Sequence, residues 1–247
     1  MWPYPKVVAH RGGGKMAPEN TIAALLCGME YGFRAVEFDV MLARDGVPVV
    51  VHDPYLGRTI PGSGNVFDYD AAELVTMDAG SWFAPRFKGE PVPLYVQYAD
   101  TCRQHGIWMN VEIKPAPGHD EATGRWVAET ARRLFAGESD LAKLPLLSSF
   151  SAAALRAARA AAPELPRAIA FGALPPDWET QARELGVLSV HVDHRHLTAG
   201  QAAAIQAAGF GLFCYTVNDP ARARTLLDWG VDAICTDRID LLPPDFK

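Results

Sequence analysis

The chain has 247 residues, of which 49% are hydrophobic, and its formal net charge is −6. This composition is typical of one or two globular domains, and the negative charge argues against a nucleic-acid surface or an anionic membrane surface. The sequence contains no run of about 18 apolar residues, so it predicts no membrane span. Its first residues, MWPYPKVVAHRGG, lack the apolar segment of a signal peptide. The four cysteines show no C-x-x-C spacing, which indicates reduced thiols and predicts a cytoplasmic protein.

Short apolar, β-branched runs alternate with helix-like segments along the chain. We predict strands at residues 6–10, 34–40, 47–52, 107–114, 145–150, 167–171, 187–192, 211–216 and 231–236. We predict helices near residues 20–31, 94–105, 120–135, 151–162, 177–185, 199–208 and 219–228. Such alternation is typical of parallel strands joined by right-handed crossovers. About eight such units in about 250 residues favour an α/β fold of the TIM (β/α)8 barrel type over a doubly wound open sheet.

One connection is too long for a plain loop. The chain between the predicted strand 47–52 and the predicted helix 94–105 is rich in glycine and proline, whereas an ordinary βα loop has about 2–6 residues. We therefore expect a single domain over residues 1–247, with a small inserted subdomain at 54–92 on the catalytic face of the barrel.

Acidic residues interrupt two of the apolar strands. Residues 36–40 read VEFDV, and strand alternation places Glu37 and Asp39 on one face. In a closed barrel the carboxyl ends of the strands share one mouth, where Glu112 would join them. Three carboxylates without a nearby thiolate favour one hard divalent cation, Mg²⁺ or Ca²⁺, as their partner. The alternative is a network of ion pairs with Lys114 and Arg11.

Two histidines also end predicted strands. The stretch HRGGG follows the first strand, where glycines allow close backbone approach to a ligand and Arg11 offers a planar fork for phosphate oxygens. His10 and His52 could supply one base and one acid, because imidazole titrates near neutral pH.

Several motifs together resemble one enzyme family. The stretches HRGGGKMAPENT (10–21), EFDVMLARDGVPVVVHD (37–53), VEIKP (111–115), YTVND (215–219) and GVDAICTD (230–237) resemble the glycerophosphodiester phosphodiesterase family. The resemblance covers nearly the whole chain, and within the family the chain looks most like the cytosolic bacterial enzyme associated with glycerol-3-phosphate uptake.

The resemblance implies a TIM barrel with an insertion after the second barrel strand and hydrolysis of glycerophosphodiesters to sn-glycerol 3-phosphate and an alcohol. It implies that His10 and His52 are the acid–base pair. It also implies that Glu37, Asp39 and Glu112 bind the metal and that Arg11 and Lys114 hold the phosphate. Tyr215 replaces a tryptophan found in many relatives, which leaves the headgroup preference open.

Other readings of this pattern differ in substrate or in activity. A phospholipase of the phosphoinositide or sphingomyelinase type would share the chemistry, but no basic amphipathic helix predicts a membrane contact. A binding protein that senses glycerophosphodiesters would keep the pocket without turnover. The sequence leaves open the choice of cation, which histidine is the base, whether a cyclic phosphate forms, and the oligomeric state.

Overall fold

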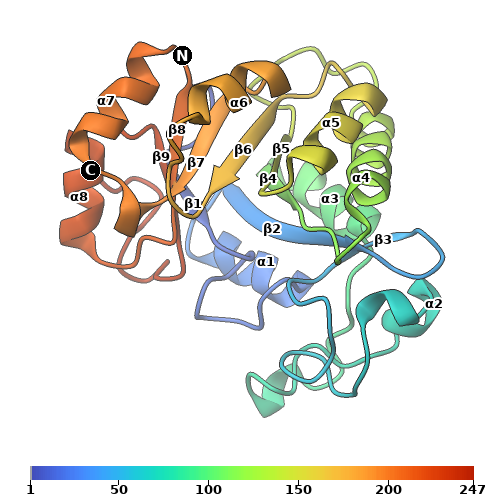
Figure 1. Ribbon diagram of the computed structural model, residues 1–247. Coiled ribbons are helices and arrows are strands. Elements are labelled where there is room, and N and C mark those ends of the chain that lie inside the picture. Colours follow the sequence, from blue (N-terminus) through green and yellow to red (C-terminus); the bar gives the residue numbers. More distant parts are fainter. Residues whose placement is uncertain (1) are drawn as a thin grey trace.

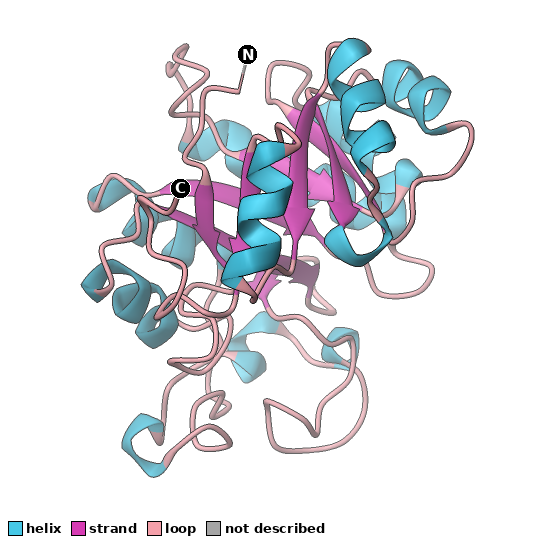
Figure 2. Cartoon of the chain, turned by 90° about the vertical axis from the view of Figure 1, so that its left-hand side faces the viewer, coloured by secondary structure: helices cyan, strands magenta, loops and turns pink. Residues whose placement is uncertain are grey.

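The computed structural model describes residues 2–247, which form a closed barrel of eight parallel strands and one additional strand (Figures 1 and 2). The strands follow the order β1-β9-β8-β7-β6-β5-β4-β2, and the pairing of Ala9 with Val36 joins β1 to β2. Their bounds are β1 Val7–Ala9, β2 Ala35–Leu42, β4 Trp108–Ile113, β5 Leu146–Ser149, β6 Arg167–Phe171, β7 Ser189–Asp193, β8 Gly211–Tyr215 and β9 Ala233–Thr236. The predicted TIM barrel is therefore confirmed.

Seven α-helices surround the barrel, and polar caps define where several of them begin. They are α1 Ile22–Glu30, α3 Tyr95–Gln104, α4 Asp120–Leu134, α5 Ala152–Ala161, α6 Trp178–Leu185, α7 Ala199–Ala207 and α8 Pro220–Asp228. The side chains of Thr21 and Ser151 accept hydrogen bonds from backbone N–H groups in the first turns of α1 and α5, which satisfies donors that a helix leaves free. Among the described residues, no helix is long and apolar enough to cross a membrane.

The strand predicted at 47–52 is not a barrel strand. The corresponding strand, β3 Pro48–Val50, pairs antiparallel with the end of β2. The last residues of β2 extend beyond the barrel wall, and β3 runs back along them. This hairpin is what returns the following residues, including His52, to the carboxyl end of the barrel.

A long segment connects β3 to α3 and carries only short helices of its own: η1 Val66–Asp68, α2 Ala71–Leu74 and η2 Pro85–Phe87. It lies on the side toward which the carboxyl ends of β6 and β7 point (Figure 1). Its apolar side chains, among them Leu56, Val66 and Leu74, pack into a small cluster with the β2–β3 hairpin. Its Glu90 accepts a hydrogen bond from the Ala23 N–H at 2.9 Å, which ties the segment to the start of α1.

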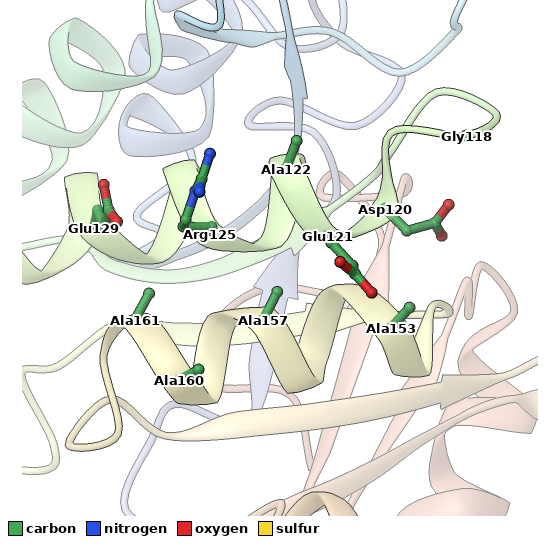
Figure 3. A pocket seen from close by; sticks show the side chains of 10 residues that line it. All are labelled: Gly118, Asp120, Glu121, Ala122, Arg125, Glu129, Ala153, Ala157, Ala160 and Ala161. Carbon is green, nitrogen blue, oxygen red and sulfur yellow. The ribbon is translucent and has the colours of Figure 1, made fainter.

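The main core lies between the strands and the surrounding helices. Close backbone contact lets α4 pack tightly on α5, because a Cβ at Gly124 would lie 2.1 Å from the Ala154 oxygen. Beside this contact, a surface groove of about 870 Å³ is lined by alanines of α5 that point toward α4, such as Ala153 and Ala157 (Figure 3). This groove contains none of the residues predicted to form the active site.

Candidate active site

The three predicted acidic residues come together at the carboxyl end of the barrel. Glu37 and Asp39 lie on β2, and Glu112 lies on β4, directly opposite Asp39 in the strand register. Each of the three offers a carboxylate oxygen, and these oxygens all lie within 4.8 Å of one another. Glu37 is 5% exposed and Asp39 is 1% exposed. Such a set of oxygen donors, two of them buried and the third partly exposed, fits a hard divalent cation.

Burial and mutual repulsion disturb the protonation of this cluster. Burial raises the pKa of Glu37, and the charges of Asp39 and Glu112 raise it further. Burial and the charge of Asp39 raise the pKa of Glu112 to about 7. Burial also opposes ionisation of Asp39, but the positive charges of Lys114 and Arg11 outweigh it and lower the Asp39 pKa. Asp39 is therefore ionised at neutral pH, while its two neighbours need further positive charge to stay ionised.

The two predicted basic residues contact the same cluster. Lys114 Nζ lies 3.3 Å from Asp39 Oδ1 and 3.5 Å from Glu112 Oε1. Arg11 Nε lies 3.5 Å from Asp39 Oδ2, and the Arg11 backbone N–H donates to Glu37 Oε2 at 3.2 Å. The ion-pair network considered from the sequence therefore exists, but it supplies two positive charges to three carboxylates. The donor set keeps an excess of negative charge that a cation would neutralise.

His10 follows β1 and is held by a carboxylate of its own. Its Nδ1 lies 2.6 Å from Asp237 Oδ1, and its Nε2 lies 3.7 Å from Glu37 Oε2. Asn218 fixes Asp237 in turn, because its Nδ2 donates to Asp237 Oδ2 at 3.0 Å. With Nδ1 bonded to Asp237, the Nε2 atom faces the acidic cluster.

His52 has a similar carboxylate partner. Its Nδ1 lies 2.6 Å from Oδ1 of the adjacent Asp53. Burial lowers the pKa of His52, and although the charge of Asp39 opposes this effect, it does not overcome it. Two imidazoles, each fixed through Nδ1, therefore stand at the same end of the barrel as the three acids.

The turn after β1 depends on glycine because it packs against other backbone. A Cβ at Gly14 would lie 2.2 Å from the Asp237 oxygen, and Gly14 has φ +54°. Arg11 itself has φ +52°, which is uncommon for a residue other than glycine. The same turn therefore holds Arg11 against β2 and brings it close to the residues after β9.

Several residues that complete the site are not marked as functional by the sequence. Asn20 precedes α1, but its side chain serves β2: it donates from Nδ2 to Asp39 Oδ2 at 2.8 Å and accepts from the Asp39 N–H at 3.2 Å. Thr21 alone caps α1. The position of Asp237 after a strand was visible in the sequence, but its pairing with His10 needed the closed barrel. Glu19 accepts from Arg11 Nη1 at 2.6 Å, and nothing in its spacing marks it.

A small cavity of about 40 Å³ is lined by His10 and by the two acids Glu37 and Glu112. Phe150 and Tyr215 line it, and their rings meet edge to face with centroids 5.8 Å apart. His191 also lines it and is 2% exposed, and burial lowers the pKa of His191 to about 3. The neutral His191 therefore belongs to the barrel interior. In the part of the chain that the structure describes, the acidic triad is the sole cluster with metal-ligand geometry.

Comparison with known proteins identifies the family that carries this arrangement. The pattern of the glycerophosphoryl diester phosphodiesterase family matches residues 10–241. A glycerophosphodiester phosphodiesterase of Caldanaerobacter subterraneus subsp. tengcongensis is 31% identical, over 94% of this chain and 93% of its own.

Solved structures agree with this match. An Oleispira antarctica phosphodiesterase, determined in complex with the product sn-glycerol 3-phosphate, superposes with a TM-score of 0.89 at 35% identity, over 98% of this chain and 95% of its own. A glycerophosphodiester phosphodiesterase from Agrobacterium tumefaciens superposes with a TM-score of 0.79 at 29% identity, over 96% and 98% of the two chains.

Proposed function

Because the chain belongs to the glycerophosphoryl diester phosphodiesterase family and is an enzyme of that family, we propose that it hydrolyses glycerophosphodiesters by acid–base catalysis between two histidines beside one divalent cation. The products are sn-glycerol 3-phosphate and an alcohol. One observation carries this proposal: the carboxylates of Glu37, Asp39 and Glu112 offer oxygens within 4.8 Å of one another, and His10 and His52 both lie beside this cluster.

The binding roles follow from charge. Glu37, Asp39 and Glu112 would hold the cation, Mg²⁺ or Ca²⁺, which stabilises charge on the phosphoryl oxygens by Lewis-acid polarisation. Arg11 and Lys114 bind the phosphate of the diester, where they favour the extra negative charge of the transition state. The Arg11 fork suits two phosphate oxygens at once, whereas Lys114 acts as a point charge.

The proton transfers fall to the two histidines. His10 is the base, because Asp237 holds its Nδ1 and leaves its Nε2 directed at the acidic cluster, where it can accept a proton from the nucleophile. His52 is the acid and protonates the departing alkoxide. Burial keeps His52 neutral in the free enzyme, and the negative charge of the bound diester favours its protonated form.

We assign the nucleophile to the glycerol hydroxyl next to the phosphate. Its oxygen bonds to phosphorus as the bond to the alcohol breaks, and water then opens the cyclic phosphate. Direct attack by water is the alternative. A cyclic phosphate observed by ³¹P NMR during turnover supports the first route. Equal cleavage rates for substrates that lack this hydroxyl would support the second.

Further expectations concern organisation and substrates. We propose that residues 1–247 act as one domain in which 54–92 is an inserted subdomain, and that the chain is of the cytosolic, glycerol-3-phosphate uptake type. Its partners are then small glycerophosphodiesters, with no nucleic acid or membrane surface. Comparing deacylated diesters with intact vesicles tests this choice against a phospholipase.

The decisive experiment is a coupled assay for glycerol 3-phosphate with and without EDTA. We expect release of glycerol 3-phosphate from water-soluble diesters, its loss on chelation, and its return with added Mg²⁺ or Ca²⁺. Binding of the diester without turnover would instead identify a sensor. Turnover that persists in EDTA would remove the cation from the mechanism.

A further inference from the structure

A chain of ion pairs runs along the rim of the candidate active site and passes through the segment between β3 and α3. We call it the rim chain. In order, its members are Asp39, Arg11, Glu19, Arg58, Asp53 and His52. Negative and positive groups alternate from Asp39 to Asp53, and Asp53 is hydrogen-bonded to His52 at the end of the chain. It joins a proposed metal ligand at one end to a proposed proton donor at the other.

Arg58 is the central link of the rim chain. Its Nε donates to Asp53 Oδ2 at 2.5 Å, and its Nη1 and Nη2 donate to the two oxygens of Glu19 at 2.8 and 2.7 Å. All three guanidinium nitrogens are therefore engaged, although the side chain is 44% exposed. A lysine could offer one ammonium group to the same carboxylates but could not reproduce this planar fork.

The local backbone explains how Arg58 reaches two partners that are distant in sequence. Gly57 has φ +119°, and its N–H donates to the Ile60 oxygen at 2.8 Å, which closes a tight turn. Glycine adopts this backbone conformation without steric cost. Arg58 is the next residue, so the turn presents its side chain toward Asp53 and Glu19 rather than along the segment.

Both partners of Arg58 touch a group that we place in catalysis. Asp53 uses Oδ2 for Arg58 and Oδ1 for the Nδ1 atom of His52. Glu19 accepts from Arg11 Nη1 at 2.6 Å as well as from Arg58. Burial opposes ionisation of Asp53, but the hydrogen bonds from Arg58 and His52 outweigh it and lower the Asp53 pKa. Without Arg58, two carboxylates would face each other across the rim, and neither would hold its present orientation.

We propose that Arg58 is a positioning residue: through Asp53 it fixes the ring of His52, and through Glu19 it fixes the fork of Arg11. The consequence is that the segment after β3 must be docked on the rim for efficient turnover. This inference rests on the proposed hydrolysis of glycerophosphodiesters and adds a residue that does not itself contact the reacting atoms.

The test compares Arg58→Ala and Arg58→Lys with Arg44→Ala. Arg44 is a matched control, because it also pairs with two carboxylates near the same segment, Asp70 and Glu73, at 54% side-chain exposure. With glycerophosphocholine and saturating cation, Arg58→Ala should lower kcat by about 10–100-fold, the usual cost of losing a residue that orients groups of the site through hydrogen bonds. Arg44→Ala should stay within about twofold of the unmodified enzyme, as for most surface changes.

Two further readouts separate positioning from stability. Added methylguanidinium should restore part of the kcat of Arg58→Ala and leave Arg44→Ala unchanged, whereas Arg58→Lys should remain impaired. The Nδ1–H proton signal of His52, assigned by its absence in His52→Gln, should persist in Arg44→Ala and be lost to exchange in Arg58→Ala.

The outcomes distinguish the two proposals. If the unmodified enzyme releases no glycerol 3-phosphate, the proposed function fails, and the His52 proton signal still decides the role of Arg58. If the unmodified enzyme is active while Arg58→Ala matches Arg44→Ala in kcat, or if the His52 signal is unchanged in Arg58→Ala, the positioning role is wrong. Full activity of Arg58→Lys would likewise overturn it.

Discussion

The two ends of the barrel interior are built from the same strands but differ in their side chains, which are apolar at one end and ionisable at the other. At the amino end, Tyr4 stacks on Trp108 with ring centroids 4.3 Å apart, and Trp2 and Phe213 pack beside them. Small and aliphatic side chains complete this apolar cluster. At the carboxyl end, the interior is filled by carboxylates, imidazoles and their cationic partners.

The strand β4 shows how abrupt the change is. Trp108 begins it and Glu112 lies four residues later, so strand alternation points both side chains to the barrel interior. The apolar end contributes hydrophobic burial, which stabilises the fold. The polar end removes charge from water, which costs stability unless partners compensate. In this barrel, stability and chemistry therefore occupy separate layers, so substitutions at the two ends should have different effects.

The largest effect is expected on turnover at the carboxyl end. His10→Ala and His52→Ala should each lower kcat by about 10²–10⁴, the usual contribution of general acid–base catalysis. Steady-state kinetics at saturating cation measure this, and the thermal stabilisation by added cation should survive in both variants. His105→Ala is the control, because His105 is exposed at the end of α3. Unchanged kcat in either variant would remove that histidine from the mechanism.

At the amino end the large effect should fall on stability instead. Trp108→Ala removes the stacked ring and the hydrogen bond from its Nε1 to the Leu144 oxygen at 3.0 Å. We expect a loss of about 3–5 kcal/mol in the free energy of unfolding. Denaturant unfolding measures it, with the 41% exposed Trp82 changed to alanine as the control.

The kcat of the folded Trp108→Ala protein shows whether the two ends of the barrel act independently. Per folded molecule, kcat of Trp108→Ala should stay close to that of the unmodified enzyme, because Trp108 lies at the start of β4, four residues before Glu112. A loss of kcat as large as that in the histidine variants would show that the two ends are coupled.

Cation binding should link stability to pH at the carboxyl end. The pKa of Glu112 is about 7 in the folded chain, above its ordinary value of 4.5. A pKa raised by folding means that Glu112 contributes stability below about pH 4.5, and that this contribution is lost as the pH rises through 7. In EDTA, Glu112→Gln should therefore gain melting temperature relative to the unmodified chain between pH 5 and pH 8.

Added cation should reverse this order of melting temperatures, so that the unmodified chain becomes more stable than Glu112→Gln. At a hundred times the Kd, a bound ion stabilises the unmodified chain by about 2.7 kcal/mol, whereas Glu112→Gln should gain much less. Differential scanning fluorimetry at both pH values measures the two effects, and Glu184→Gln on the exposed face of α6 serves as the control. Equal stabilisation of all three proteins by Mg²⁺ and Ca²⁺ would mean that the ion binds elsewhere.

The sequence predicted the barrel and its acidic cluster because both depend on local pattern. The period of apolar runs located the strands, and parallel strand ends must meet in a closed barrel. A strand was predicted at 47–52, but its antiparallel pairing with β2 was not, because a β-branched run looks the same in a parallel and in an antiparallel strand. The direction of β3 depends on the tight turn at Asp45 and Gly46 and on the extension of β2 beyond the barrel.

The contacts that join site residues distant in sequence could not be predicted in the same way. Asp237 reaches His10 across 227 positions of sequence, and Arg58 reaches Glu19 across 39. Such contacts depend on barrel closure and on the docking of the segment after β3. The role of Asn20 could not be read from the sequence, because asparagine before a helix is also a good cap, and its contact with Asp39 forms only in the folded chain.

The smallest effect should come from Tyr215, a polar side chain that lies at the reactive end but has a structural partner. Its hydroxyl donates to the Phe171 oxygen at 2.8 Å, and burial raises its pKa, so the phenol stays protonated at neutral pH. Tyr215→Phe keeps the ring beside Phe150 and removes one hydrogen bond, which is worth about 0.5–1.5 kcal/mol. We therefore expect a lower melting temperature, by about 2–4 °C per kcal/mol for a chain of this size, and nearly unchanged kcat. A drop in kcat of about 10² or more, the signature of acid–base catalysis, would instead place Tyr215 among the reacting groups and move the boundary between the two layers.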